Sequence, residues 1–143
     1  MTRFAAFPLL AAFVLAGLGA GCSQTLDPPV QDDLDDTEYT LTTHDSTAVT
    51  FPDGYSGDVL VVGYVYTQCP DVCPMITANM KKIRAALEST DGVRFVTITF
   101  DPERDTPSRL HTYRAAYGID APTWDFLTGR PETIDQLMKR MGV

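Results

Sequence analysis

The sequence has few of the groups that most binding and catalytic classes need. It contains two histidines, three cysteines and one tryptophan, and neither lysine nor arginine occurs between Arg3 and Lys81. Its 11 basic and 19 acidic residues give a net charge of −8, so a basic face for nucleic acid is not expected. Three cysteines are too few for a four-cysteine zinc site or an iron–sulfur cluster within one copy. The chain also has no internal repeat and no glycine-rich nucleotide-binding loop.

The first 21 residues are typical of a targeting segment. Arg3 precedes an uncharged apolar run, and small residues precede Cys22, as in a bacterial lipoprotein signal that is cleaved before a lipid-bearing cysteine. A signal peptide cut nearby, or an uncleaved anchor, would fit the same run of 18 uncharged residues over 4–21. Each interpretation puts the remaining chain outside the cytoplasm, at the extracytoplasmic face of a bacterial membrane, which is the periplasmic side in a Gram-negative cell.

Residues 22–38 are expected to be an acidic tether that the lipid on Cys22 holds at the membrane. Acidic residues and two prolines dominate this stretch, and it has no basic residue, so it cannot bury enough surface to fold. Residues 39–143 remain for one domain of about a hundred residues, which can bury a sizeable core.

Two apolar runs and the helical pattern between them predict a β-α-β unit. The valine-rich run over 59–66 predicts a central strand that is buried on both faces. A helix is expected over 74–89, with an inward stripe at the helical period, namely Ile76, Met80, Ile83 and Leu87. The run over 93–100 predicts a second strand, parallel to the first through a right-handed crossover.

The flanking elements complete an α/β chain with an N-terminal β-hairpin. Strands are expected over 38–43 and 47–51 around a turn, and again over 123–127. A helix over 108–117 should end at Gly118, with Asp105 or Thr106 as its cap and Pro107 in its first turn. The last helix should begin at Pro131 and turn three residues inward, namely Ile134, Leu137 and Met138.

Cys69 and Cys73 occur where the first buried strand leads into a helix. Unpaired N–H groups and the helix dipole make a thiol easier to ionise there. Residues four apart on a helix have Cβ atoms roughly 5–6 Å apart, so the two sulfurs could chelate one ion or, after a small adjustment, form a disulfide. A pair of thiolates is a soft ligand set, which favours Cu(I) or zinc over magnesium or calcium. The spacing alone also leaves open a structural pair of thiols or a plain disulfide.

Acidic residues accompany the cysteines at the same edge of the predicted sheet. Cys69 follows one parallel strand and Asp101 follows the other, so the two should lie near each other. Asp101 either orients the site or belongs to a loop that leads to a helix cap. Asp71, between the cysteines, is the second acidic residue expected around the site. His44 in a turn and His111 on a helix do not follow a strand end of this unit, and neither is expected to be a ligand.

Three blocks of the sequence resemble the Sco/SenC family, and the resemblance extends from about Tyr39 to Val143. The blocks are Thr67-Gln-Cys-Pro-Asp-Val-Cys-Pro74, Thr99-Phe-Asp-Pro-Glu-Arg-Asp-Thr-Pro107 and Trp124-Asp-Phe-Leu-Thr-Gly129. The resemblance implies a thioredoxin-like copper protein that helps to assemble the CuA centre of cytochrome c oxidase. It implies that Cys69 and Cys73 bind Cu(I), with Cu(II) as a second state, and that they can cycle to a Cys69–Cys73 disulfide.

The same resemblance predicts that part of the family's domain is missing. Sco-type sites use a third ligand, a histidine far downstream, and the sequence stops before that region. The last strands of a thioredoxin-like sheet are missing too, which would leave an unpaired edge. Residues 39–143 are therefore expected to be an incomplete thioredoxin-like domain in a chain truncated at its C-terminus, with the third ligand beyond Val143.

The function expected from these features is that of a metallochaperone rather than an enzyme. It would hand copper to the oxidase subunit that bears CuA, or to another copper protein, by ligand exchange. The alternative is an extracytoplasmic thiol–disulfide oxidoreductase that acts on the cysteines of a partner through the same two residues. A peroxidase fits less well, because the Thr-x-x-Cys pattern of peroxiredoxins is one residue longer than Thr67-Gln-Cys69. A purely structural disulfide domain is the remaining interpretation.

Overall fold

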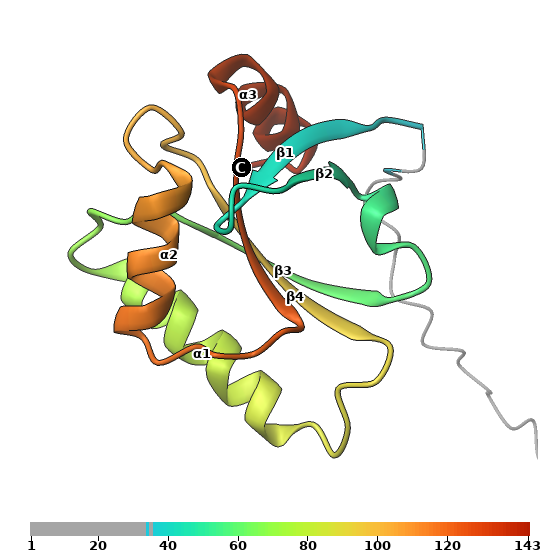
Figure 1. Cartoon of the computed structure of the whole chain (residues 1–143), viewed down its shortest axis with the longest axis vertical. Helices are drawn as coiled ribbons and strands as arrows, with labels where there is room; N and C mark the ends of the chain where they lie inside the picture. The colour runs from blue at the N-terminus through green and yellow to red at the C-terminus, as the bar shows by residue number, and fades with distance from the viewer. Residues whose placement is uncertain (1–33, 35) are drawn as a thin grey trace, which may run out of the picture.

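A computed structural model describes residue 34 and residues 36–143 (Figure 1). The predicted signal segment, Cys22 with its lipid, and nearly all of the acidic tether lie outside these residues. Within the described part of the chain, no helix is both long enough and apolar enough to cross a membrane.

The described residues form one mixed sheet with helices on both of its faces. The strands are β1 (Tyr39–Thr43), β2 (Ala48–Phe51), β3 (Val59–Val65), β4 (Val93–Thr99) and β5 (Trp124–Thr128). The helices are the 3-10 turn η1 (Asp53–Tyr55), α1 (Val72–Ala86), α2 (Pro107–Ala116) and α3 (Pro131–Arg140). The strand order is β2-β1-β5-β4-β3, in which β3, β4 and β5 run parallel and β1 runs antiparallel to both of its neighbours. The predicted hairpin and β-α-β unit are confirmed.

Helices α1 and α2 cover one face of the sheet, and Figure 1 shows them on the same side of β3 and β4. Alternate residues of β4 and β5 point toward them because side chains along a strand alternate between the two faces. Phe95, Trp124 and Phe126 form the centre of this layer, and Met80 of α1 and Leu110 of α2 close it.

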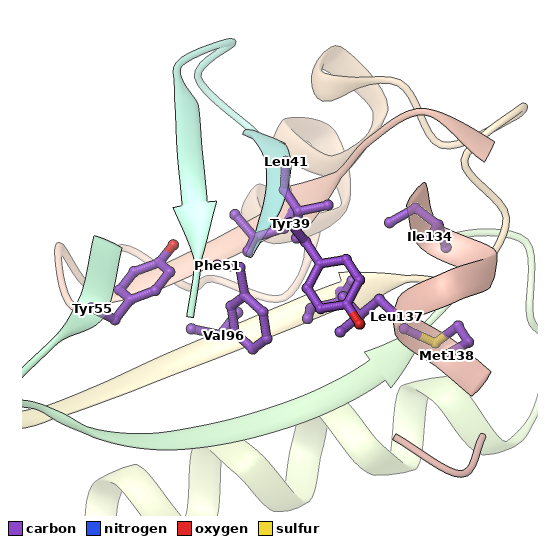
Figure 2. Packing of buried hydrophobic residues seen from close by; sticks show 10 residues of the cluster. Tyr39, Leu41, Phe51, Tyr55, Val96, Ile134, Leu137 and Met138 are labelled. Carbon is purple, nitrogen blue, oxygen red and sulfur yellow. The ribbon is translucent and has the colours of Figure 1, made fainter. Parts of the chain in front are cut away.

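The β1–β2 hairpin and α3 cover the opposite face. Strand β1 pairs with β5 only at Thr42 and Thr43, so the hairpin leaves the sheet plane and folds back over it. Figure 2 shows Tyr39 and Phe51 of the hairpin against Val96, beside the inward residues of α3, which are Ile134, Leu137 and Met138. All three of these α3 residues are buried, as the sequence predicted.

Strand β3 is not the central strand that its apolar run predicts. In the described sheet it pairs with β4 alone, and β4 is the strand that lies between two parallel neighbours. Val59 at the start of β3 is 67% exposed, whereas five of the seven residues of β4 are at most 1% exposed, namely Phe95, Val96, Thr97, Ile98 and Thr99. A valine-rich run is compatible with an edge strand that a helix covers as well as with a central strand, because the run does not show how many strands pair with it.

The predicted inward stripe of α1 is only half correct. Met80 is buried and Ile76 is partly buried, but Ile83 is 47% exposed and Leu87, just past the helix end, is 38% exposed. The second half of α1 is therefore covered less than its first half. The helical period was right, but the period cannot show how far the partner surface reaches.

A glycine in β3 allows α1 to approach the sheet closely. A Cβ at Gly63 would collide with the sulfur of Met80 and would lie 3.5 Å from the side chain of Ile76. Gly63 therefore sets the distance between α1 and β3, and through it the position of the first turn of α1.

Replacing Gly63 by Val should lower the free energy of unfolding by about 1–3 kcal/mol, because overpacking forces a buried neighbour to move. Urea denaturation measures this loss. A Gly63→Val/Met80→Ala double variant should lose less stability than the sum of the losses of the two single variants, since alanine at position 80 leaves room for valine at position 63. Additive losses would show that Met80 does not limit the approach of α1.

Candidate dithiol site

The two cysteines lie at the carboxyl edge of the parallel strands. Val65, the last residue of β3, is paired with Thr99, the last residue of β4, so the loops that follow begin side by side. Cys69 lies in the loop after β3, and Cys73 is the second residue of α1. The Cys73 backbone N–H donates to Cys69 Sγ over 3.3 Å. Cys69 therefore accepts an otherwise unpaired N–H from the first turn of the helix, as its position in the sequence suggested.

Several donors converge on the sulfur of Cys69 and stabilise its thiolate. Burial opposes ionisation, but the backbone N–H of Asp71, the thiol and N–H of Cys73, and the hydroxyl of Tyr66 all donate to it. Together these hydrogen bonds lower the pKa of Cys69 to about 7. Cys69 is also the more exposed of the two cysteines, so its sulfur is ionised and accessible near neutral pH.

Cys73 is the protonated partner of this pair. It is 1% exposed, and this burial, followed by the hydrogen bond to Cys69, raises the pKa of its thiol to about 11. Both thiols are free in the structure, which shows no Cys69–Cys73 disulfide. Between the two pKa values the site therefore holds one negative charge and one proton on two adjacent sulfurs.

A buried carboxylate holds the loop that carries Cys69. Asp105 is fully buried and accepts hydrogen bonds from the Thr67 N–H at 2.9 Å, the Thr67 hydroxyl at 2.5 Å and the Thr99 hydroxyl at 2.6 Å. The sequence suggested Asp105 or Thr106 as the cap of α2, and the structure has Thr106 as the cap and Asp105 as the link between the two strand ends.

The two acidic residues expected around the site are placed differently from Asp105. Asp71 has an exposed side chain and contributes its backbone N–H to Cys69 rather than its carboxylate. Asp101 pairs with Arg104 over 2.8 Å, and its backbone N–H donates to the Thr99 hydroxyl. Tyr66, which no sequence motif indicated, both donates to Cys69 and packs against Phe100 with ring centroids 5.1 Å apart.

The two histidines lie together at the junction of β1 and β5. The His44 ring is buried, and its Nδ1 accepts the Phe126 N–H at 3.3 Å. The His111 ring centroid is 6.2 Å away from it, on α2. Among the described residues, no cluster of three or more His, Cys, Asp or Glu side chains is arranged to hold a metal. The described part of the site thus offers two sulfur ligands.

The depressed pKa of Cys69 should appear in its alkylation kinetics. Iodoacetamide should modify Cys69 with a rate that rises to a plateau with a midpoint near pH 7, because only the thiolate reacts. Mass spectrometry after limited reaction should find Cys69 modified well before Cys73. A Cys73→Ala variant should move the midpoint upward, since one hydrogen bond to the thiolate is lost. A midpoint near that of a free cysteine, about 8.5, would contradict the geometry.

Asp105→Ala should destabilise the domain by about 2–4 kcal/mol, because it leaves buried donors of Thr67 and Thr99 without an acceptor. Thermal or urea unfolding measures the change. Asp101→Ala is the matched control, since it removes a partly exposed ion pair at the same loop and should cost no more than about 1 kcal/mol. Equal losses in the two variants would argue against a special role for the buried carboxylate.

Comparison with known proteins agrees with this geometry. The family model described as SCO1/SenC matches residues 28–143. The SCO1 protein homolog of Bacillus subtilis is 29% identical over 122 residues, which cover 85% of this chain and 62% of that protein.

Two solved structures share the fold at similar levels of identity. Bradyrhizobium japonicum ScoI with copper bound is 30% identical with a TM-score of 0.64, over 73% of this chain and 64% of that one. BsSco, described as a Sco family cytochrome c oxidase assembly protein with a disulfide switch, is 27% identical with a TM-score of 0.68, over 79% and 65% of the two chains. The thioredoxin-like fold expected from the sequence is therefore confirmed.

The chain spans 33% to 62% of the length of the curated relatives that it matches. The family model nevertheless covers the whole of the described sheet together with both cysteines of the site. This protein belongs to the SCO1/SenC family.

Proposed function

We propose that this protein carries Cu(I) on Cys69 and Cys73 and delivers it during assembly of the CuA centre of cytochrome c oxidase. The observation that carries the proposal is that the backbone N–H and the thiol of Cys73 both donate to the Cys69 sulfur at the carboxyl edge of the sheet, with Cys69 partly exposed. Two related structures support it, since one is described with copper bound and the other as an oxidase assembly protein.

The chemistry of the donor set fits copper as a cargo. Thiolates are soft ligands that favour Cu(I), and Cys69 already provides one near neutral pH. Cys73 would have to lose its proton on binding, so copper uptake should release protons. Two sulfurs leave room for a further donor, which suits ligand exchange with a partner. The histidine expected beyond Val143 stays a prediction for that third position.

The protein would work at the outer face of a bacterial membrane. The proposal rests on the apolar segment before Cys22, the lipid expected on that cysteine, and the acidic residues that follow. The tether would let the domain of residues 39–143 reach a membrane-bound oxidase subunit while its dithiol stays exposed to that partner.

Cys69→Ser and Cys73→Ser should each abolish stoichiometric Cu(I) binding, because one thiolate alone cannot chelate the ion. The measurement is a Cu(I) titration of the reduced protein against a coloured Cu(I) chelator as competitor. Cys22→Ser is the matched control, since it removes a thiol that lies outside the pair, and it should bind as the wild type does. Unchanged Cu(I) binding in either Cys69→Ser or Cys73→Ser would contradict the proposal.

A thiol–disulfide oxidoreductase is the second candidate, and the low pKa of the accessible Cys69 favours it. A wild-type protein that does not bind Cu(I), yet reduces a disulfide substrate through the same two cysteines, would identify this function instead. The Cu(I) titration distinguishes the two candidates. The reduction potential of the pair then separates an oxidoreductase from a structural disulfide, which would have a much lower potential.

A further inference from the structure

A groove lies beside the dithiol loop. Its volume is about 370 Å³, and it lies between the loop that precedes Cys69 and one side of α2. Figure 1 shows α2 next to α1 on the same face of the sheet, with the chain entering both helices from the strand ends. The groove is lined by Thr67, Gln68, Ser108, Arg109, Thr112, Tyr113 and Ala116.

The walls of this groove are held in place by contacts to the core. Thr67 is bound through both its N–H and its hydroxyl to the buried carboxylate of Asp105. Tyr113 shares a hydrogen bond of 3.0 Å with Thr77 of α1, and its ring packs on Tyr117 with centroids 4.6 Å apart. A groove that is already formed costs little ordering when it binds a partner.

Arg109 gives the groove a single positive charge. Within the described part of the chain its guanidinium pairs with no carboxylate, whereas Arg94 and Arg104 pair with Asp58 and Asp101. No acidic residue lines the groove, so Arg109 is the charged residue of its lining. A guanidinium binds a carboxylate through two parallel hydrogen bonds, which favours recognition of Asp or Glu.

The other lining groups suit an extended polypeptide. The amide of Gln68 can donate and accept, and the hydroxyls of Ser108 and Thr112 can do the same, so they can pair with the N–H and C=O groups of a peptide backbone. Gln68 directly precedes Cys69, so a bound peptide in the groove would lie beside the reactive sulfur.

We propose that this groove recognises an acidic segment of the partner protein, next to the partner cysteine that exchanges with Cys69. The proposal rests on the proposed function, because either copper transfer or disulfide exchange brings a partner sulfur to Cys69. Arg109 then acts as a specificity-determining residue that selects partners with a carboxylate a few positions from that cysteine. It takes no part in the exchange itself.

The test uses short peptides with one central cysteine and either a glutamate, a glutamine or a lysine two positions away. The peptide cysteine carries 2-nitro-5-thiobenzoate as a mixed disulfide. The Cys69 thiolate attacks the peptide sulfur, a bond forms between these two sulfurs, and the bond to the aromatic sulfur breaks. The electron pair leaves with the coloured thionitrobenzoate anion, whose release gives the rate. All variants carry Cys22→Ser, so that the partly exposed Cys69 and the buried Cys73 are the remaining cysteines.

Arg109→Gln should lower the ratio of the glutamate-peptide rate to the lysine-peptide rate by about two- to fivefold at low ionic strength, as expected for one partly exposed charge pair. The glutamine peptide should react at an unchanged rate, which would show that the dithiol is intact. Lys139→Gln is the matched control, because it makes the same change in net charge on α3, on the opposite face of the sheet. An unchanged ratio in Arg109→Gln, or an equal fall in Lys139→Gln, would overturn the proposal.

The assay uses no copper, so its outcome is separate from that of the Cu(I) titration. A protein that binds no Cu(I) but shows the Arg109-dependent preference keeps the groove as the recognition element of a thiol–disulfide exchanger. A protein that binds Cu(I) normally but shows no preference loses the groove proposal alone.

Discussion

The buried carboxylate of Asp105 holds together the parts of the chain from which the site is built. It binds Thr67 in the loop before the cysteines and Thr99 at the end of β4, and it directly precedes the cap of α2. Burying a carboxylate is costly unless hydrogen-bond donors surround it, so the loss of one of these contacts weakens the others. The dithiol loop, the end of β4 and the start of α2 are therefore expected to move as one unit, and the groove beside the cysteines keeps its shape.

The two sulfurs differ in acidity although they are neighbours. Cys69 lies before the helix and accepts several hydrogen bonds, whereas Cys73 is buried in the first turn of α1 and donates to Cys69 through both its thiol and its N–H. One accessible thiolate beside one buried thiol is suited to stepwise exchange, since the outer sulfur meets a partner first and the inner sulfur follows. This division is compatible with either copper transfer or disulfide exchange, which is why the two functions need a direct binding measurement.

Much of the fold could be predicted from local patterns. Hydrophobic period, turn residues and caps located every β-strand and α-helix of the described residues to within a few positions, because these depend on near neighbours in the sequence. The failures have a common cause. The exposure of Ile83 and Leu87 and the edge position of β3 depend on which elements pack against each other. A pattern of apolar residues does not show which elements these are.

The sequence by itself determined the two cysteines, their position between a strand and a helix, and the parallel strand whose end lies beside them. Those features follow from spacing and from the rules of β-α-β connection. The tertiary structure alone decided that Asp105 is buried against Thr67, that Tyr66 donates to Cys69, and that Arg109 faces a groove next to the thiolate. Each of these contacts joins side chains whose meeting depends on how helices pack on a sheet, and that packing is set by the whole core.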